Sequence, residues 1–276
     1  MRTQEQSILN VRDLQVQIRT KAGFSTLVQD INFEMKEGKV LGLVGESGSG
    51  KTVTSMSILQ LHDRNNIDIE GSITLHGREL NGMGKKEMRN IRGREIAFIM
   101  QNPMNAFTPV FTIGHQFVET IRTHTSFKKK QAKELAMDVM HSVNLPEPDK
   151  LLKNYPFQLS GGMLQRVMIA MAACLRPSVI IADEPTTALD VHSQLLVLRL
   201  LDKIRSDYGT SILLISHDLG VISEIADDVM VMQHGRIVEK ANVFNLFDHP
   251  QHEYTKKLLR TRPTLYFQNQ PYTYTL

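Results

Sequence analysis

The chain has 276 residues, of which 41% are hydrophobic and 22% are charged, and its formal net charge is +3. This size and composition predict one soluble α/β domain with room for an inserted subdomain, and the weak charge argues against nucleic acid as a partner. The single cysteine, Cys174, excludes a disulfide within the chain and an iron–sulfur cluster held by four cysteines, which suits a reducing cytoplasm. No apolar run approaches the roughly 20 residues that cross a bilayer, and the first seven residues lack the apolar core of a signal peptide. We therefore expect that the protein could serve a membrane only from outside the bilayer and through a partner.

Two kinds of strand pattern alternate along the chain. Residues 8–18 and 31–35 alternate apolar and polar side chains, which predicts an antiparallel β layer. Residues 40–44 form an unbroken apolar run, as strands of a parallel sheet buried on both faces do. Similar runs follow at 96–100, 179–182, 212–215 and 229–232. Helical stretches separate most of these runs, so we predict an α/β fold with a parallel, doubly wound core sheet.

The character of the chain changes between residues 102 and 158, where no buried-strand run occurs. Leu135, Val139 and Val143 lie four residues apart and predict one apolar helix face. The basic run Lys128–Lys130 is interpreted as a solvated helix start. We therefore expect a single domain over residues 1–262 with a helical insert at about 102–158, followed by a tail at 263–276 that carries no functional signal.

A glycine-rich loop follows the first buried strand and precedes a helical stretch at 53–61, which is the context that a phosphate-binding loop requires. Its glycines let successive backbone N–H groups converge on phosphates, and the helix N-terminus adds partial positive charge. Lys51 is predicted to neutralise the β- and γ-phosphates, and the Thr52 hydroxyl to bind Mg²⁺. The residues expected to bind ATP here are Gly45, Glu46, Ser47, Gly48, Ser49, Gly50, Lys51, Thr52 and Val53.

Polar side chains end three further strands of the predicted sheet, at the edge where open α/β sheets bind ligands. Asp183 and Glu184 follow the run at 179–182. Asp183 could reach Mg²⁺, and Glu184 could act as the general base that polarises the attacking water. His217 follows the run at 212–215 and could contact the γ-phosphate, and Gln101 follows the run at 96–100 and could sense the γ-phosphate or Mg²⁺.

These elements in this order, together with Leu159–Arg166, resemble the ATPase subunit of an ABC transporter over residues 8–262. The resemblance implies that Ser160, Gly161, Gly162 and Gln165 bind the nucleotide held by a second ATPase subunit. It further implies that Ala188–Asp190 is a dimer-contact loop and that Gln101 links the sheet to the insert. The expected partners are a homologous second ATPase, with a homodimer possible, two membrane permease subunits and, indirectly, an extracytoplasmic binding protein. The expected location is the cytoplasmic face of the cell membrane.

Shorter segments resemble one branch of that family, the peptide and nickel importers. Met100–Pro109 and Pro250–Thr255 resemble this branch as a whole, and Ile99–Pro103, Tyr155–Phe157 and Ser160–Arg166 are most similar to the nickel importers. The cysteines of the C-terminal cluster that many peptide-import ATPases carry are absent. These features favour ATP-driven nickel import, free or chelated, with di- or oligopeptide import as the alternative. His249 and His252 belong to the C-terminal pattern and are not interpreted as nickel ligands.

One further site assignment and two alternative functions remain. Phe24 is the residue nearest to where the family stacks adenine on an aromatic ring, and an apolar hairpin residue is the equal alternative. A soluble ABC ATPase that acts on DNA or ribosomes typically carries a coiled-coil insertion or two ATPase domains, and the chain shows neither. A P-loop kinase has no use for Ser160–Gly162 opposite a phosphate-binding loop.

Overall fold

The computed structural model describes residues 6–63, 65–187 and 189–260. Its centre is a six-stranded sheet in which five neighbouring strands are parallel and only the edge strand β10 runs antiparallel. The strand order is β10 (Arg236–Asn242), β9 (Asp228–Gln233), β3 (Val40–Val44), β8 (Ser211–Ser216), β7 (Val179–Asp183) and β6 (Ile96–Ile99). The predicted parallel core sheet is confirmed.

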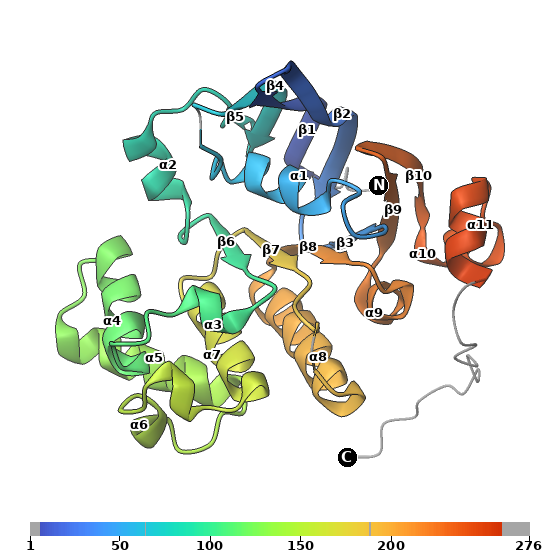
Figure 1. Cartoon of the computed structure of the whole chain (residues 1–276). Helices are drawn as coiled ribbons and strands as arrows, with labels where there is room; N and C mark the ends of the chain where they lie inside the picture. The colour runs from blue at the N-terminus through green and yellow to red at the C-terminus, as the bar shows by residue number, and fades with distance from the viewer. Residues whose placement is uncertain (1–5, 64, 188, 261–276) are drawn as a thin grey trace.

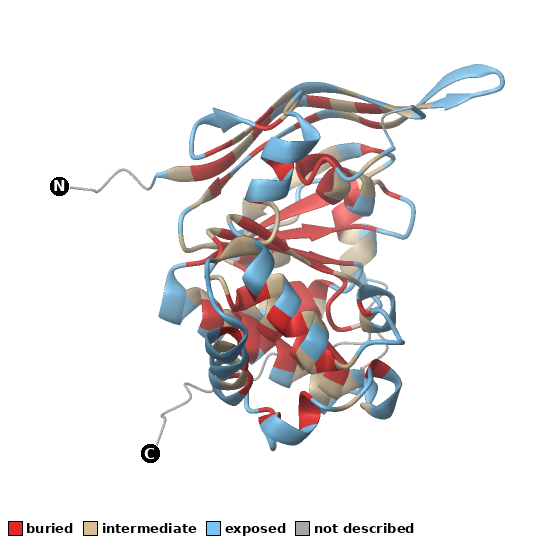
Figure 2. Cartoon of the chain, turned by 90° about the vertical axis from the view of Figure 1, so that its left-hand side faces the viewer, coloured by how far each residue is buried: buried red, intermediate tan, exposed pale blue. Residues whose placement is uncertain are grey.

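A second, antiparallel sheet lies above the first in Figure 1. Its order is β2 (Gly23–Lys36), β1 (Ser7–Thr20), β4 (Ile67–Leu75) and β5 (Arg78–Glu79). The antiparallel layer was predicted from two strands, and the structure adds β4, whose sequence also alternates. The hairpin between β1 and β2 projects from the body with an exposed tip (Figure 2).

Helices cover both faces of the core sheet. Helix α1 (Lys51–Ile58) lies between the two sheets, and α2 (Lys85–Ile91) joins β5 to β6 (Figure 1). The opposite face is covered by α8 (Val191–Tyr208) and α9 (Leu219–Ile225), and the described chain ends with α10 (Val243–Asp248) and α11 (Glu253–Arg260). In the described residues, no helix combines the length and apolarity that a membrane crossing demands.

The unbroken apolar runs are explained by two separate cores on the faces of the sheet. In β3, Leu41 and Leu43 pack toward α1 and the antiparallel sheet, whereas Val40 and Val44 pack toward the helices of the other face. Because successive side chains of a strand point to opposite faces, a strand covered on both sides needs apolar residues at every position. Gly42 fits this packing, because a Cβ there would lie 2.6 Å from Ile222.

A group of helices occupies the lower part of the molecule in Figure 1, away from the antiparallel sheet. Its members are α3 (Pro103–Ala106), α4 (Ile113–His124), α5 (Lys129–Ser142), α6 (Pro148–Leu151), the 3-10 helix η1 (Pro156–Gln158) and α7 (Gly161–Ala173). Lys128 is the N-cap of α5. The fully buried side chains of α5 are Ala132, Ala136 and Met140, and the predicted Leu135 and Val139 lie half-buried beside them. Helix α7 packs on both α3 and α5, so this helical region is continuous with the helix that follows Ser160.

Candidate functional site

The phosphate-binding loop connects β3 to α1 and is held tightly against the β9–β10 turn. A Cβ on Gly45 would lie 2.2 Å from the Met232 carbonyl oxygen, so only glycine fits at this position. Gly48 and Gly50 have φ angles of 80° and 110°, which side chains rarely tolerate. The Gly235 N–H donates to the Ser49 carbonyl at 2.9 Å. The loop conformation is therefore set by its neighbours before any ligand binds.

Lys51 is buried at the start of α1, with 6% of its surface exposed. Its ammonium group donates to the carbonyl oxygens of Gly45 at 2.7 Å and Glu46 at 3.0 Å. Burial lowers the pKa of Lys51 below its ordinary value, and the carboxylates of Glu184 and Asp183 oppose this shift. A desolvated ammonium held by two weak carbonyl acceptors can be stabilised strongly by an anion.

Asp183 ends β7 beside the phosphate-binding loop, and it is 4% exposed. Burial raises the pKa of its carboxyl, whereas a hydrogen bond from the Thr52 side chain lowers it. Its Oδ1 atom is buried and has no hydrogen-bond partner among the residues that the structure describes. An orphaned carboxylate oxygen next to a hydroxyl is a fitting donor set for Mg²⁺, which prefers oxygen ligands. Gln101, which follows β6, could contribute an amide oxygen from the neighbouring strand end.

Glu184 adopts a left-handed backbone conformation with φ of 51°, an uncommon geometry for a residue with a side chain. Its N–H donates to the Ile215 carbonyl at 2.9 Å, which fixes the turn against β8. The carboxylate accepts a hydrogen bond from the Thr187 hydroxyl at 2.9 Å. His217 Nδ1 lies 2.8 and 2.9 Å from the two carboxylate oxygens, so an ionised Glu184 makes this nitrogen the donor.

One cavity of about 690 Å³ gathers residues from the ends of four strands. It brings together the predicted Lys51, Thr52, Gln101, Glu184 and His217. Three predicted residues are buried and do not line this cavity: Gly45, Ser49 and Asp183. The full lining is Leu27, Glu46, Ser47, Gly48, Gly50, Lys51, Thr52, Val53, Gln101, Glu184, His217 and Leu258. A cavity of this size is in the range of small-molecule sites.

The structure does not bring Phe24 to this cavity. Phe24 lies near the tip of the β1–β2 hairpin with 57% of its surface exposed, and the Arg19 guanidinium sits 5.5 Å from its ring centroid. Phe24 is thus an exposed apolar residue of the hairpin, which was the alternative to adenine stacking. Besides the predicted Val53, the apolar side chains that line the cavity are Leu27 and Leu258. Sequence reasoning assigned neither to the site, because a single leucine carries no local signal of a ligand.

The signature segment lies at a different cavity of about 290 Å³, lined in part by Ser160, Gly161, Gly162 and Asp190. Ser160 caps α7 by accepting a hydrogen bond from the Met163 N–H at 3.3 Å. A Cβ on Gly161 would meet no atom within 4 Å, so packing within the chain does not require this glycine. The cavity that holds Lys51 includes none of these residues.

The structure separates Gln165 from the rest of the predicted signature group. Gln165 is only 2% exposed, and within the described part of the chain its buried Nε2 atom has no hydrogen-bond partner, so it does not share the open surface of Ser160. The predicted dimer-contact residue Ala188 lies outside the described residues. Its neighbour Asp190 caps α8 by accepting from the Ser193 N–H at 3.0 Å.

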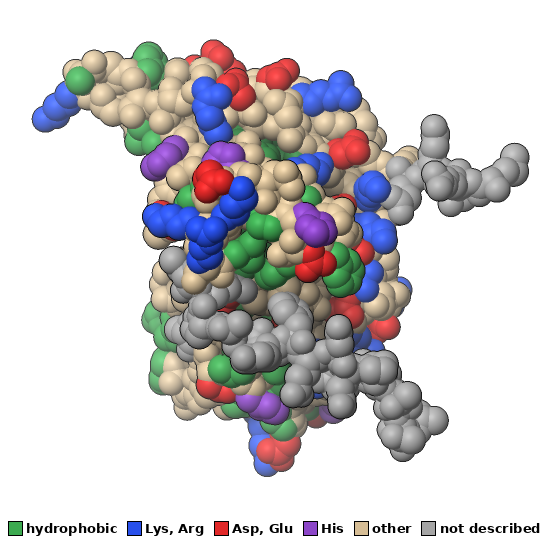
Figure 3. Space-filling model, turned by 90° about the vertical axis from the view of Figure 1, so that its right-hand side faces the viewer, with side chains coloured by type: hydrophobic (Ala, Val, Ile, Leu, Met, Phe, Trp, Pro, Cys, Tyr) green, Lys and Arg blue, Asp and Glu red, His purple; other side chains and the backbone are tan. Residues whose placement is uncertain are grey.

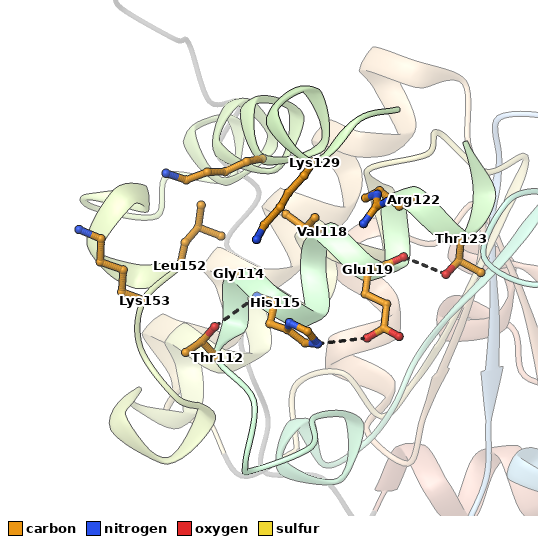
Figure 4. A pocket seen from close by; sticks show the side chains of 11 residues that line it. Thr112, Gly114, His115, Val118, Glu119, Arg122, Thr123, Lys129, Leu152 and Lys153 are labelled. Carbon is orange, nitrogen blue, oxygen red and sulfur yellow. Dashed lines mark hydrogen bonds and ion pairs between the residues drawn. The ribbon is translucent and has the colours of Figure 1, made fainter. Parts of the chain in front are cut away.

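A further cavity of about 710 Å³ lies between α4, α5 and α6, and none of the predicted site residues lines it (Figure 4). Its walls carry several cationic side chains and one carboxylate. Glu119 lies 3.8 Å from His115 Nε2, and Lys133 pairs with Asp149 at 3.4 Å. The remaining cations of the lining are Arg122, Lys129 and Lys153. This surface belongs to the helical region and contains no part of the phosphate-binding machinery.

Comparisons with known proteins place these features in one family. The family model described as ABC transporter matches residues 28–187. The chain is 41% identical over 261 residues to the oligopeptide transport ATP-binding protein OppD of Lactococcus lactis subsp. cremoris, with 95% of the chain and 77% of that protein covered. It is 42% identical to OppD of Bacillus subtilis over 94% of the chain and 72% of that protein.

The fold is also similar to a solved structure described as the dimeric ATP-binding cassette MJ0796 in a post-hydrolysis state bound to ADP and Pi. The TM-score is 0.77 at 23% identity, over 86% of this chain and 99% of that one. The predicted fold, with its parallel core sheet and antiparallel β layer, is thus the ABC ATPase fold. On the match of the family model and the identity to these relatives, the chain belongs to the ABC transporter family.

Proposed function

We propose that the chain hydrolyses ATP in the cavity lined by Lys51, Glu184 and His217. The observation that carries this proposal is that one cavity combines a phosphate-binding loop, a buried ammonium and a carboxylate paired with a histidine. The phosphates would accept hydrogen bonds from the backbone N–H groups of the loop and from Lys51. Mg²⁺, held by Thr52, Asp183 and Gln101, would neutralise phosphate charge when bound.

Glu184 is proposed to accept the proton of the attacking water. Its carboxylate is oriented by Thr187 and His217, so the geometry of the base is fixed before the substrate arrives. With Nδ1 of His217 donating to Glu184, Nε2 of the same ring donates to the γ-phosphate only in the imidazolium, which carries a proton on both nitrogens. A preorganised pair of this kind lowers the barrier because little reorientation is needed during the reaction.

We further propose that a second ATPase subunit completes the site. Ser160 and the glycines after it line a cavity separate from that of Lys51, at the N-terminus of α7, where the first backbone N–H groups of a helix lack intrahelical acceptors. A partner's bound nucleotide could accept hydrogen bonds there. The similar fold of MJ0796 comes from a structure described as dimeric. A homologous second chain is the proposed partner, and a homodimer is the alternative.

The proposed setting is the cytoplasmic face of a membrane, against two permease subunits, with an extracytoplasmic binding protein as an indirect partner. Helix α7 supports this arrangement, because it begins at the signature and packs on α3 and α5 of the helical region. Closure at Ser160 would therefore move α7 together with α3 and α5, and the helical region would transmit this motion to the permeases.

For the cargo we propose an oligo- or dipeptide. The support is that relatives covering more than nine tenths of the chain are named for oligopeptide transport. The nickel interpretation depended on short segments such as Ile99–Pro103 and on the missing cluster cysteines. Similarity over the whole chain outweighs those segments, so peptide import, the former alternative, becomes the preferred proposal.

A genetic experiment tests the cargo. Deletion of the gene should abolish growth on an oligopeptide that supplies a required amino acid, and it should leave accumulation of radiolabelled nickel unchanged. Complementation with the wild-type gene should restore growth, and complementation with a Glu184→Gln gene should not. Loss of nickel accumulation with normal peptide growth would move the protein to the nickel branch.

A further inference from the structure

The C-terminal helix α11 lies against the nucleotide cavity, although about 200 residues separate the two in sequence. The hydroxyl oxygen of Tyr254 accepts a hydrogen bond from the backbone N–H of Glu46 in the phosphate-binding loop, at 3.0 Å. One helical turn later, Leu258 lines the cavity itself. Figure 3 views the molecule from the side on which α11 lies, and Lys and Arg side chains gather on that face.

The helix is anchored in a fixed register. The carboxylate of Glu239 in β10 accepts hydrogen bonds from the N–H groups of Gln251 at 2.7 Å and His252 at 3.0 Å. Burial alone would raise the pKa of Glu239, but these hydrogen bonds outweigh it and lower the pKa. His252 Nδ1 in turn accepts from the Tyr254 N–H at 3.2 Å. The position of the tyrosine is thus tied to the edge of the core sheet.

The peptide unit between Gly45 and Glu46 connects this helix to the predicted chemistry. Its N–H donates to the Tyr254 hydroxyl, and its carbonyl oxygen, that of Gly45, accepts from the Lys51 ammonium at 2.7 Å. A shift of this peptide unit would therefore alter the position of the ammonium relative to a bound phosphate. Tyr254 is 6% exposed and belongs to the core on the α8 and α9 side of the sheet, so packed neighbours surround its ring.

We propose that Tyr254 is a positioning residue for the phosphate-binding loop and that α11 forms a wall of the nucleotide site. The inference rests on the proposed placement of ATP in this cavity. It extends the site beyond residues 28–187, the part of the chain that the family model matches. The apolar contact with the nucleotide base or ribose would come from Leu258 and Leu27, in place of Phe24.

The purely structural reading is that Tyr254 only fills the core under β9 and β10. The two interpretations differ in what they expect when only the hydroxyl group is removed, because Tyr254→Phe keeps the ring and its packing. The matched control is Tyr208→Phe at the end of α8, where the ring stacks with Arg176 at 5.0 Å. Both variants lose one hydroxyl, and only the first loses a contact with the loop.

The experiment measures ATP affinity of the isolated chain by titration calorimetry, with the melting temperature recorded for each variant. Tyr254→Phe should weaken ATP binding about three- to tenfold, the effect of one lost hydrogen bond, and Tyr208→Phe should leave it unchanged. Melting temperatures of the two variants should stay similar. Unchanged affinity in Tyr254→Phe, or an equal loss in both variants, would overturn the proposal.

A second measurement keeps the test decisive if Tyr254→Phe does not fold. The Glu46 amide of the wild-type chain should exchange its hydrogen slowly without nucleotide, and an unprotected amide would contradict the contact. Lys51→Ala serves as the reference for the proposed function. If Lys51→Ala binds ATP normally, the nucleotide placement fails, whereas a loss there with normal Tyr254→Phe binding refutes the role of Tyr254 alone.

Discussion

Replacing Lys51 by alanine removes the one ammonium that the cavity lining contributes among the described residues. The group is buried, its pKa is lowered by desolvation, and it is held by the carbonyl oxygens of Gly45 and Glu46. Nothing else in that lining carries a permanent positive charge. The γ-phosphate would therefore lose the one fixed side-chain cation that the described part of this lining offers.

The size of the effect follows from the geometry. Two unit charges about 3 Å apart interact by roughly 5 kcal/mol at an effective dielectric constant of about 20. The net stabilisation is smaller than this, because the ammonium gives up its two carbonyl acceptors to reach a phosphate. A remaining loss of about 3–4 kcal/mol, the usual scale for one preorganised contact, corresponds to about 10²–10³ in rate.

The assay is steady-state phosphate release by the assembled transporter at saturating ATP. Lys130→Ala is the matched control, because its side chain is 90% exposed on α5 and lies 4.0 Å from Glu134. We expect the control to hydrolyse ATP at the wild-type rate. If Lys51→Ala retains more than half of that rate, the assigned role of this lysine is wrong.

Three further variants test other parts of the account. Glu184→Gln should bind ATP normally and lose at least about 10²-fold in turnover, because an amide cannot accept the proton; hydrolysis at the wild-type rate would rule out Glu184 as the base. Ser160→Arg should suppress the rate of the assembled dimer and leave ATP binding to the isolated chain intact, and an unchanged rate in the assembly would refute the shared site. Gly114→Ala should destabilise the fold by about 1–3 kcal/mol in thermal unfolding, because its Cβ would lie 2.5 Å from the Leu152 carbonyl oxygen. Gly161→Ala, whose Cβ meets open space, is the control, and equal melting temperatures for the two variants would contradict that packing argument.

The parts of the site that lie next to a strand were predictable from the sequence. Lys51, Glu184 and His217 each follow an apolar run that marks a buried parallel strand, and parallel strands end at one edge of the sheet. The direct contact between His217 and Glu184 was not predicted, because it depends on the left-handed turn at Glu184.

Contacts between segments that lie far apart along the chain could not be predicted from the sequence. Tyr254 lay in the segment Pro250–Thr255, which was recognised by resemblance alone, and only the folded chain places its hydroxyl at Glu46. Gln165 was grouped with Ser160 by its position in a motif, but α7 turns it into the core. A helix period decides which face a residue occupies, and a motif does not encode where the neighbouring elements lie.

The most direct test of the central claim is transport by the purified system in proteoliposomes, with the second ATPase, the two permease subunits and the binding protein present. The account predicts that ATP drives uptake of a labelled oligopeptide, that each uptake requires phosphate release, and that Glu184→Gln abolishes both. Accumulation of radiolabelled nickel without peptide uptake, or peptide uptake that persists with Glu184→Gln, would contradict it.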